Sequence, residues 1–325
     1  MFYNNFGKQT YYIKFGHLLS GVILMIGYLF LGIALIAGAT KGYCGKTISG
    51  KIKTLTDSVL VNTGRMLCCI VIGFLFTLAQ DGFSSLMVEP QTLWIALLGG
   101  VCSALFVISW LFSVKQSAYM MVEVFLLIGS MIPISFSALF FDEKIRVIQG
   151  VGIVILCIAV YIMSTYNASI KGKISFKALL PLVVAGIANG LTDFSQKMFS
   201  RVRDTDSVSA FNLYTYVFAA AVLLLFYLFL RVRNVKSQES ASNFKILRHI
   251  WVYILVMSLC LYINSYFKTL SSGYITATKL YPLNQGAAII LSLLMSSIFF
   301  KEKINAKCIF GISLAFIALL FINLL

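Results

Sequence analysis

Long apolar stretches, separated by short polar connections, follow one another along the chain. A helix that crosses a bilayer needs about 20 consecutive, mostly apolar residues. Segments of about this length occur at 18–40, 59–80, 92–114, 118–141, 147–165, 176–198, 208–231, 249–270, 274–300 and 305–325. The pattern therefore predicts ten transmembrane helices, with room for longer connections only at 41–58 and 232–248.

The composition agrees with a membrane protein. Hydrophobic residues make up 60% of the 325 residues and charged residues only 11%, whereas about a quarter of a soluble domain is charged. The fold class expected is therefore an all-α integral membrane protein, with the lipid bilayer as its main partner. Lys and Arg outnumber Asp and Glu by 26 to 11, and we assign this excess to lipid headgroups, with no nucleic-acid partner.

A doubled motif divides the chain into two copies of one unit. The sequence SALFFDEKI at 137–145 returns as SSIFFKEKI at 296–304, and ten of 28 positions are identical between 137–164 and 296–323. Residues 45–59 similarly resemble 196–208. The predicted division is 1–170, a first five-helix repeat with an N-terminal extension, and 171–325, a second repeat. An odd number of helices per copy turns the second copy upside down, giving two inverted five-helix repeats, as in many secondary transporters.

The doubled motif itself is expected to be structural. Each copy joins two antiparallel spans, its phenylalanines suit the boundary of the bilayer, and its charges reach headgroups or water. Glu143 and Glu302 are expected to cap the helix that follows each turn, because carboxylates stabilise a helix N-terminus.

The chain resembles the EamA-type, ten-helix branch of the drug/metabolite transporter superfamily. The resemblance covers nearly the whole chain and is carried by the doubled FF-x-EK-I turn and by Arg65 in NTGRMLCC. The chain departs from it in an extension at about 17–24 and in Tyr214, which stands at the place corresponding to Arg65. The resemblance implies a multi-pass protein of a bacterial-type plasma membrane, with a central cavity and with 147–165 and 305–325 at the periphery. These peripheral segments are the candidate surface for a homodimer.

Polar residues inside the apolar segments are the candidates for a substrate site, because burying them in lipid costs several kcal/mol unless they are paired or face water. In 176–198, Asn189, Asp193 and Lys197 share one face of a helix. An Asp193–Lys197 pair held only for structure is an equally weighted alternative. Lys197 is expected at the membrane interface.

The segment 274–300 carries a second group, Lys279, Tyr281, Asn284 and Gln285, around Pro282. A proline-interrupted helix can expose polar backbone to a substrate, while ordinary hydrogen bonding between helices is the alternative. Glu123 occupies nearly the place in the first repeat that Lys279 occupies in the second. The two are therefore expected to face each other, either as a binding pair or as a salt bridge that closes one side.

Arg65 is a candidate for gripping an anionic group, with contact to headgroups as the alternative. Tyrosines at four positions are candidates for stacking on a planar ring. Glu123 and Asp193 are the only acidic residues well inside the segments, which makes them candidate proton carriers; exchange or facilitated diffusion is the alternative. The full candidate substrate-binding set is Arg65, Tyr119, Glu123, Asn189, Asp193, Tyr214, Tyr262, Lys279, Tyr281, Asn284 and Gln285.

No motif in the sequence indicates an enzyme, a cofactor or a metal. There is no HExxH sequence, no P-loop, no CxxC pair and no Ser/His/Asp set. We therefore expect a secondary transporter that moves a small polar organic metabolite, amino-acid-like or nucleoside-like, by alternating access. The alternatives are an exchanger or carrier of a phosphorylated or other anionic metabolite, and a membrane scaffold without transport.

Overall fold

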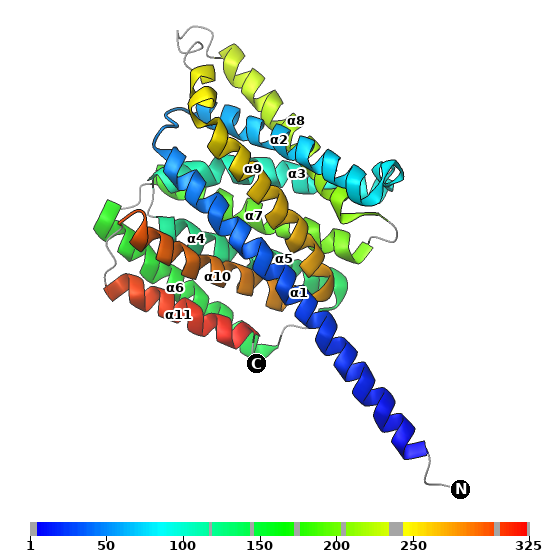
Figure 1. The fold of residues 1–325 in the computed structure, drawn as a ribbon. Helices are drawn as coiled ribbons and strands as arrows, with labels where there is room; N and C mark the ends of the chain where they lie inside the picture. Colours follow the sequence, from blue (N-terminus) through cyan, green and yellow to red (C-terminus); the bar gives the residue numbers. More distant parts are fainter. Residues whose placement is uncertain are drawn as a thin grey trace.

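The computed structural model describes residues 5–116, 119–143, 146–171, 176–202, 206–233, 243–301 and 306–323, and these residues form a bundle of helices (Figure 1). The first half contains α1 (Asn5–Ser49), α2 (Leu55–Asp81), a 3-10 turn η1 (Phe83–Leu86), α3 (Pro90–Gln116), α4 (Tyr119–Gly129), α5 (Met131–Phe141) and α6 (Val147–Lys171). The second half contains α7 (Phe176–Val202), α8 (Val208–Arg233), α9 (Asn243–Tyr274), α10 (Ala277–Ile298) and α11 (Ala306–Asn323).

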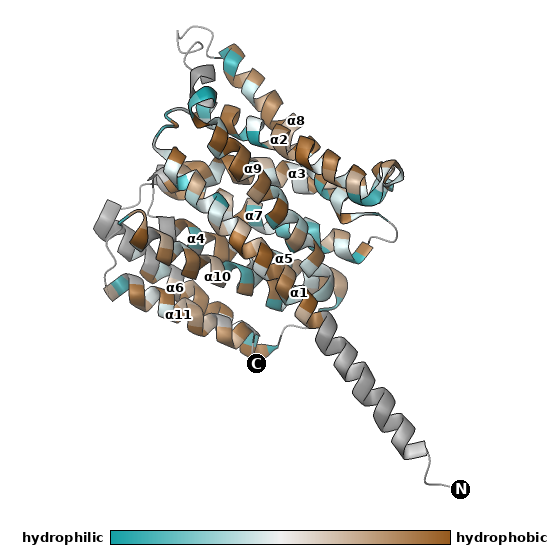
Figure 2. Cartoon of the chain, viewed as in Figure 1, coloured by the Kyte–Doolittle hydropathy of each residue, from teal (hydrophilic) through white to brown (hydrophobic). Residues whose placement is uncertain are grey.

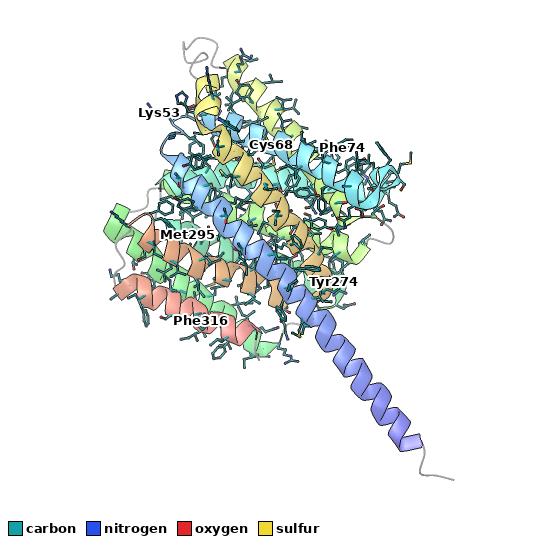
Figure 3. The ribbon with its side chains drawn as sticks, in the orientation of Figure 1. Lys53, Cys68, Phe74, Tyr274, Met295 and Phe316 are labelled. Atoms are coloured by element: carbon teal, nitrogen blue, oxygen red, sulfur yellow. The ribbon has the colours of Figure 1, made fainter. Side chains whose placement is uncertain are left out.

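The helices make an integral membrane protein. Five helical stretches are long and apolar enough to cross a bilayer, at Leu24–Ser49, Leu55–Asp81, Pro90–Val114, Val208–Arg233 and Arg248–Tyr274. Brown, hydrophobic residues cover most of the bundle in Figure 2. Large apolar side chains such as Phe74 and Phe316 are exposed on its outside (Figure 3). A surface of this kind is stable against lipid chains.

The predicted segment 118–141 differs from the structure, which breaks it at Ser130 into α4 and α5. Pro133 has no N–H to donate to the carbonyl of Gly129 four residues earlier, so the helical ladder is interrupted there. The Ser130 hydroxyl donates to the carbonyl of Leu127 at 2.6 Å, which satisfies one of the groups at the end of α4.

The connection expected at 41–58 is also different, because α1 continues to Ser49. The next helix starts at a capping box: the Thr54 hydroxyl accepts from the Asp57 N–H, and the Asp57 carboxylate accepts from the Thr54 N–H. The true connection is therefore short. As a consequence Lys41, which the sequence placed outside the membrane, lies within a helix.

Most contacts between residues distant in sequence join the first half of the chain to the second. α1 packs along α9, α3 packs on α7 and α8, and α2 packs on α8 and α9. α4 contacts both α7 and α10, while α6 and α11 pack against each other at one edge of the bundle (Figure 1). This leaves α6 and α11 away from the centre, where the polar residues gather.

α4 and α7 approach each other through glycines. A Cβ built on Gly190 would lie 2.2 Å from the carbonyl oxygen of Gly129, and a Cβ built on Gly129 would lie 2.1 Å from the carbonyl oxygen of Gly186. Gly186 and Gly190 are four residues apart on α7, the small-residue spacing that lets two membrane helices meet closely. The backbone of α4 is therefore held against α7 near the centre of the bundle.

Gly190→Ala should lower the thermal stability of the purified protein by an amount equivalent to about 1–3 kcal/mol, because the added methyl group pushes against rigid backbone. Gly32→Ala on α1 is the matched control, since nothing lies within 4 Å of its Cβ position; alanine there should be neutral or slightly stabilising. Equal melting temperatures for the two variants would show that the α4–α7 contact is not this tight.

Candidate functional site

A cavity of about 100 Å³ lies between the two halves of the bundle. A single water needs roughly 10–15 Å³ of such space, so the cavity has room for several waters or a small polar group. Seven helices line it, namely α1, α3, α4, α7, α8, α9 and α10. No described residue of α2, α6 or α11 lines it.

Two opposite charges in the cavity are not paired with each other. Lys41 of α1 and Glu123 of α4 both line it. The Lys41 ammonium lies 5.9 Å from the ring centre of Phe106, and Glu123 shares the cavity wall with Trp110. Among the described residues, no carboxylate lies within ion-pair distance of Lys41, so both charges remain available to a bound solute.

A third charge at the cavity is already neutralised. Lys268 of α9 lies 2.5 Å from the Asp193 carboxylate of α7, which also accepts from the Asn189 amide at 3.5 Å. Asp193 is fully buried. One of the two alternatives from the sequence paired Asp193 with Lys197, one turn along the same helix; the structure instead pairs Asp193 with Lys268 of α9.

Side-chain amides form much of the remaining polar wall. Asn189, Gln196, Asn264, Asn284 and Gln285 line the cavity. Gln196 donates to the Ser265 hydroxyl at 2.9 Å, and Asn264 donates to the carbonyl of Ala34 at 2.6 Å. One oxygen each on Gln196 and Asn284 has no hydrogen-bond partner in the described part of the chain. Buried polar atoms are seldom left unpaired, so these oxygens are suited to accept protons from a solute.

The structure places the predicted residues in three groups. Glu123, Asn189, Asn284 and Gln285 line the cavity. Asp193 and Tyr281 lie directly behind it: the Tyr281 hydroxyl donates to the carbonyl of Asp193 at 2.7 Å. The other described members of the set do not line it, and the side chain of Tyr119 lies outside the described residues. These other members are Arg65, Tyr214, Tyr262 and Lys279.

Each of these four has a different environment. Lys279 is exposed on α10, so it does not face Glu123 as the repeat had predicted. The Tyr214 hydroxyl donates to the carbonyl of Leu86 at 2.7 Å and so fastens η1 to α8. Tyr262 is buried against Phe76, with ring centres 5.6 Å apart.

Arg65 is buried without an acidic partner among the described residues. Its guanidinium donates to the Asn62 side chain at 2.7 Å, and its Nε has no hydrogen-bond partner. A buried guanidinium without a counter-ion is costly. Arg65 therefore does not reach lipid headgroups, as one sequence alternative had it, but adds positive charge beside the cavity.

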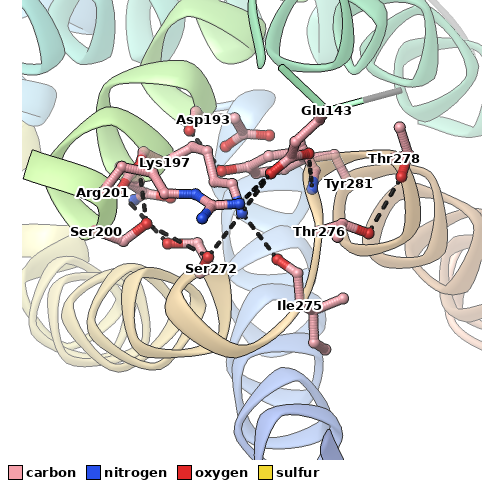
Figure 4. Close-up of polar contacts among 12 residues, drawn as sticks. Glu143, Asp193, Lys197, Ser200, Arg201, Ser272, Ile275, Thr276, Thr278 and Tyr281 are labelled. Atoms are coloured by element: carbon pink, nitrogen blue, oxygen red, sulfur yellow. Dashed lines mark hydrogen bonds and ion pairs between the residues drawn. The ribbon is translucent and has the colours of Figure 1, made fainter. Parts of the chain in front are cut away.

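Beyond the cavity, the carboxylate of Glu143 joins the turn after α5 to α7 and to the start of α10 (Figure 4). It lies 3.2 Å from the Lys197 ammonium and 2.7 Å from the Arg201 guanidinium, and it accepts from the Ala277 N–H at 2.9 Å. Two expectations are corrected here. Lys197 is buried rather than at the interface, and Glu143 contacts the N-terminus of α10 rather than that of α6, which directly follows its turn.

Sequence reasoning missed Lys41, Trp110 and Tyr216 as cavity residues. Lys41 was lost because the run TKGYCGK looks like a connection. Trp110 and Tyr216 lie in strongly apolar segments, where aromatic residues carry no distinguishing signal. Lys268 and Asn264 were visible in the 249–270 segment, but their neighbours on other helices were not.

Comparison with known proteins supports a transporter. Residues 176–324 match the EamA-like transporter family. No curated protein sequence shows significant similarity to the chain. One solved crystal structure superposes with a TM-score of 0.62 over 94% of this chain and 97% of its own, at 14% sequence identity. That likeness shows the fold alone, while the family match supports the resemblance seen in the sequence.

Proposed function

We propose that this protein is a membrane transporter that carries a small polar metabolite through the central cavity by alternating access. The match of residues 176–324 to the EamA-like transporter family supports transport. The favoured substrate class is a zwitterion, such as an amino-acid-like solute. A nucleoside-like solute is compatible with the aromatic rings of Phe106, Trp110 and Tyr216 in the wall.

The proposal is carried by the observation that two carboxylates are in ion pairs while the two opposite charges in the cavity are not. The carboxylates of Asp193 and Glu143 each contact a cation, whereas Glu123 and Lys41 share one cavity without forming an ion pair. Charges in the membrane interior are expensive unless they are paired or functional. A solute with one ammonium and one carboxylate would satisfy both, with the carboxylate at Lys41 and the ammonium at Glu123.

One observation favours the runner-up, an anionic metabolite. Near the cavity are three cations, Lys41, Arg65 and Lys268, and two carboxylates, Glu123 and Asp193, so the set has one surplus positive charge. A solute with an additional carboxylate or a phosphate would balance that surplus. Measuring the binding of anionic and of zwitterionic solutes to the protein distinguishes the two proposals.

The helix packing agrees with two copies of one five-helix unit, and the odd number of helices per copy would invert the second copy, as the proposed alternating access requires. In this comparison α1, α2 and α3 correspond to α7, α8 and α9, α4 together with α5 corresponds to α10, and α6 corresponds to α11. Each contact between the halves then has a counterpart between the corresponding helices. α1 packs on α9 as α7 packs on α3, α2 packs on α9 as α8 packs on α3, and α1 contacts α10 as α7 contacts α4. The cavity is lined by helices of both halves of the chain, and inverted-repeat transporters bind their substrates between their repeats.

A thermal-shift screen of the purified protein tests the substrate class. Zwitterionic amino acids, nucleosides, phosphorylated sugars and hydrophobic cations should each be added at millimolar concentration. A ligand at 100 times its dissociation constant stabilises by about 2.7 kcal/mol, so zwitterions should raise the melting temperature. Stabilisation by phosphorylated or dicarboxylic solutes alone would favour the runner-up, and stabilisation by hydrophobic cations alone would contradict both.

A further inference from the structure

We propose that Glu143, Lys197 and Arg201, with the backbone groups they bind, form a breakable latch that closes one end of the substrate pathway. This inference rests on the proposed transport function and assigns one end of the cavity a specific closing contact. The contributing groups come from the turn after α5, from the end of α7, from the end of α9 and from the start of α10 (Figure 4).

The latch lies at one end of the bundle, beyond the cavity. Ser271, next to the latch carbonyl of Ser272, donates to the carbonyl of Gly27 on α1. The cavity-lining part of α1 follows at 35–42. Further along α1, Lys46 donates to the carbonyl of Val114 at the other end, about 28 Å from Gly27 at 1.5 Å per residue. The cavity is thus between the latch and a separate contact.

The latch can open at the contact between Glu143 and Lys197, because each of these two buried side chains, 7% and 2% exposed, has a further partner. Lys197 is buried, but its ammonium also donates to the carbonyls of Ser272 and Ile275, each at 3.0 Å. The Arg201 side chain is 45% exposed and can turn to water. Glu143 lies outside the helices, directly after Asp142, whose left-handed backbone (φ 52°) ends α5. Glu143 can therefore move away together with Arg201, while Lys197 keeps its two carbonyl contacts.

The Asp193–Lys268 pair is different in this respect. Burial does not distinguish the two pairs, since the Asp193 and Lys268 side chains are 0% and 8% exposed and those of Glu143 and Lys197 are 7% and 2% exposed. The difference is that Glu143 has a second cation, Arg201, whereas Asp193 has only Lys268 within ion-pair distance in the described part of the chain. Separating them would strand two charges inside the membrane, which is strongly unfavourable. The two ion pairs are about one turn of α7 apart, yet only the Glu143 contact has the alternatives that a reversible closure requires.

Opening the latch would also release the start of α10. The N-cap residue of this helix, Thr276, makes no side-chain capping hydrogen bond. The Glu143 carboxylate supplies the missing acceptor to the Ala277 N–H, where a negative charge is favoured. Pro282 lies within α10, between this end and the cavity residues Asn284 and Gln285. Movement of the helix start is therefore linked to the cavity wall.

The latch carboxylate is ionised at neutral pH. Burial raises the pKa of Glu143, but the hydrogen bond from Arg201, the charge of Lys197 and the Ala277 N–H together hold that pKa below its ordinary value. A lowered pKa in the folded state stabilises the contact above the ordinary glutamate value, about 4.3. The stabilisation is lost only as pH falls through the lowered pKa.

Sided labelling of a cavity cysteine tests the latch in the full-length protein. Ala39 lines the cavity, so Ala39→Cys is the reporter, and the protein without this change gives the background from native cysteines. A membrane-impermeant thiol reagent is added to right-side-out and to inverted vesicles. Glu143→Gln should raise the labelling rate from the latch face roughly tenfold, the factor expected for losing one charge-assisted hydrogen bond.

Lys197→Met should raise labelling from the same face, because it breaks the same contact from the other side. Glu89→Gln is the control, since Glu89 is exposed and distant in sequence from the latch. An unchanged rate, or equal increases from both faces together with a lower melting temperature, would overturn the latch. The labelling needs no solute, so it judges the latch separately from the thermal-shift screen, which judges the proposed function.

Discussion

Asp193→Asn should lower the stability of the protein by about 3–5 kcal/mol, the cost of breaking a buried ion pair by removing one partner. The substitution keeps the shape of the side chain but leaves the Lys268 ammonium without its counter-ion inside the membrane. Thermal unfolding in detergent, followed by tryptophan fluorescence or by loss of the monodisperse peak, measures the effect.

The double variant Asp193→Asn with Lys268→Met separates the pair from its surroundings. It removes both charges, so most of the lost stability should return, and the double-mutant cycle should give a large coupling energy. Asp142→Asn is the matched control, because Asp142 is exposed and asparagine tolerates its left-handed backbone. Additive effects of the two substitutions would mean that Asp193 and Lys268 do not interact as described.

Glu123→Gln and Lys41→Met should each weaken binding of a zwitterionic substrate by roughly 10- to 100-fold. The estimate corresponds to about 1.5–3 kcal/mol for a hydrogen bond to a charged group. Lys41 and Glu123 do not form an ion pair with each other, so neither substitution breaks a salt bridge. Each should therefore change the melting temperature of the ligand-free protein far less than Asp193→Asn does. Isothermal titration with the best solute from the screen measures the effect.

The pattern of the losses also identifies which end of the solute each residue binds. The Lys41→Met substitution should not weaken the binding of an analogue that lacks the carboxylate. The Glu123→Gln substitution should not weaken the binding of an analogue that lacks the ammonium group. Lys51→Met and Glu89→Gln are controls, because both side chains are exposed. Unchanged affinity in both cavity variants would remove the two charges from the site.

The helices were predictable because lipid imposes one simple rule on sequence. Apolar runs of spanning length had to be helical, and the described residues of each run are mostly helical, although only five helical stretches are long and apolar enough to cross a bilayer. The break at Ser130 was not predictable from hydropathy, since Gly129 and Pro133 do not interrupt the apolar run. The resemblance to EamA-like transporters was also visible in the sequence, because the doubled turn at 137–145 and 296–304 repeats several identities, and residues 176–324 match that family.

The candidate site was predictable only in part. Asn189, Asn284 and Gln285 were found because an amide within an apolar run is conspicuous. Lys41 was not, since α1 continues through a polar, glycine-containing stretch that resembles a connection. The ion-pair partners could not be predicted: Lys268 binds Asp193, and Lys197 binds Glu143. These partners come from different elements of the chain, and the relative positions of the helices depend on close packing such as that at Gly190.

Solute counterflow tests most directly the claim that this cavity carries a metabolite across the membrane. Purified protein is reconstituted into liposomes loaded with the unlabelled solute identified by the screen, and labelled solute is added outside. We predict transient accumulation of label with the wild-type protein, and none with empty liposomes or with the Lys41→Met variant. A solute that binds tightly in the cavity but shows no counterflow with correctly folded protein would contradict the account.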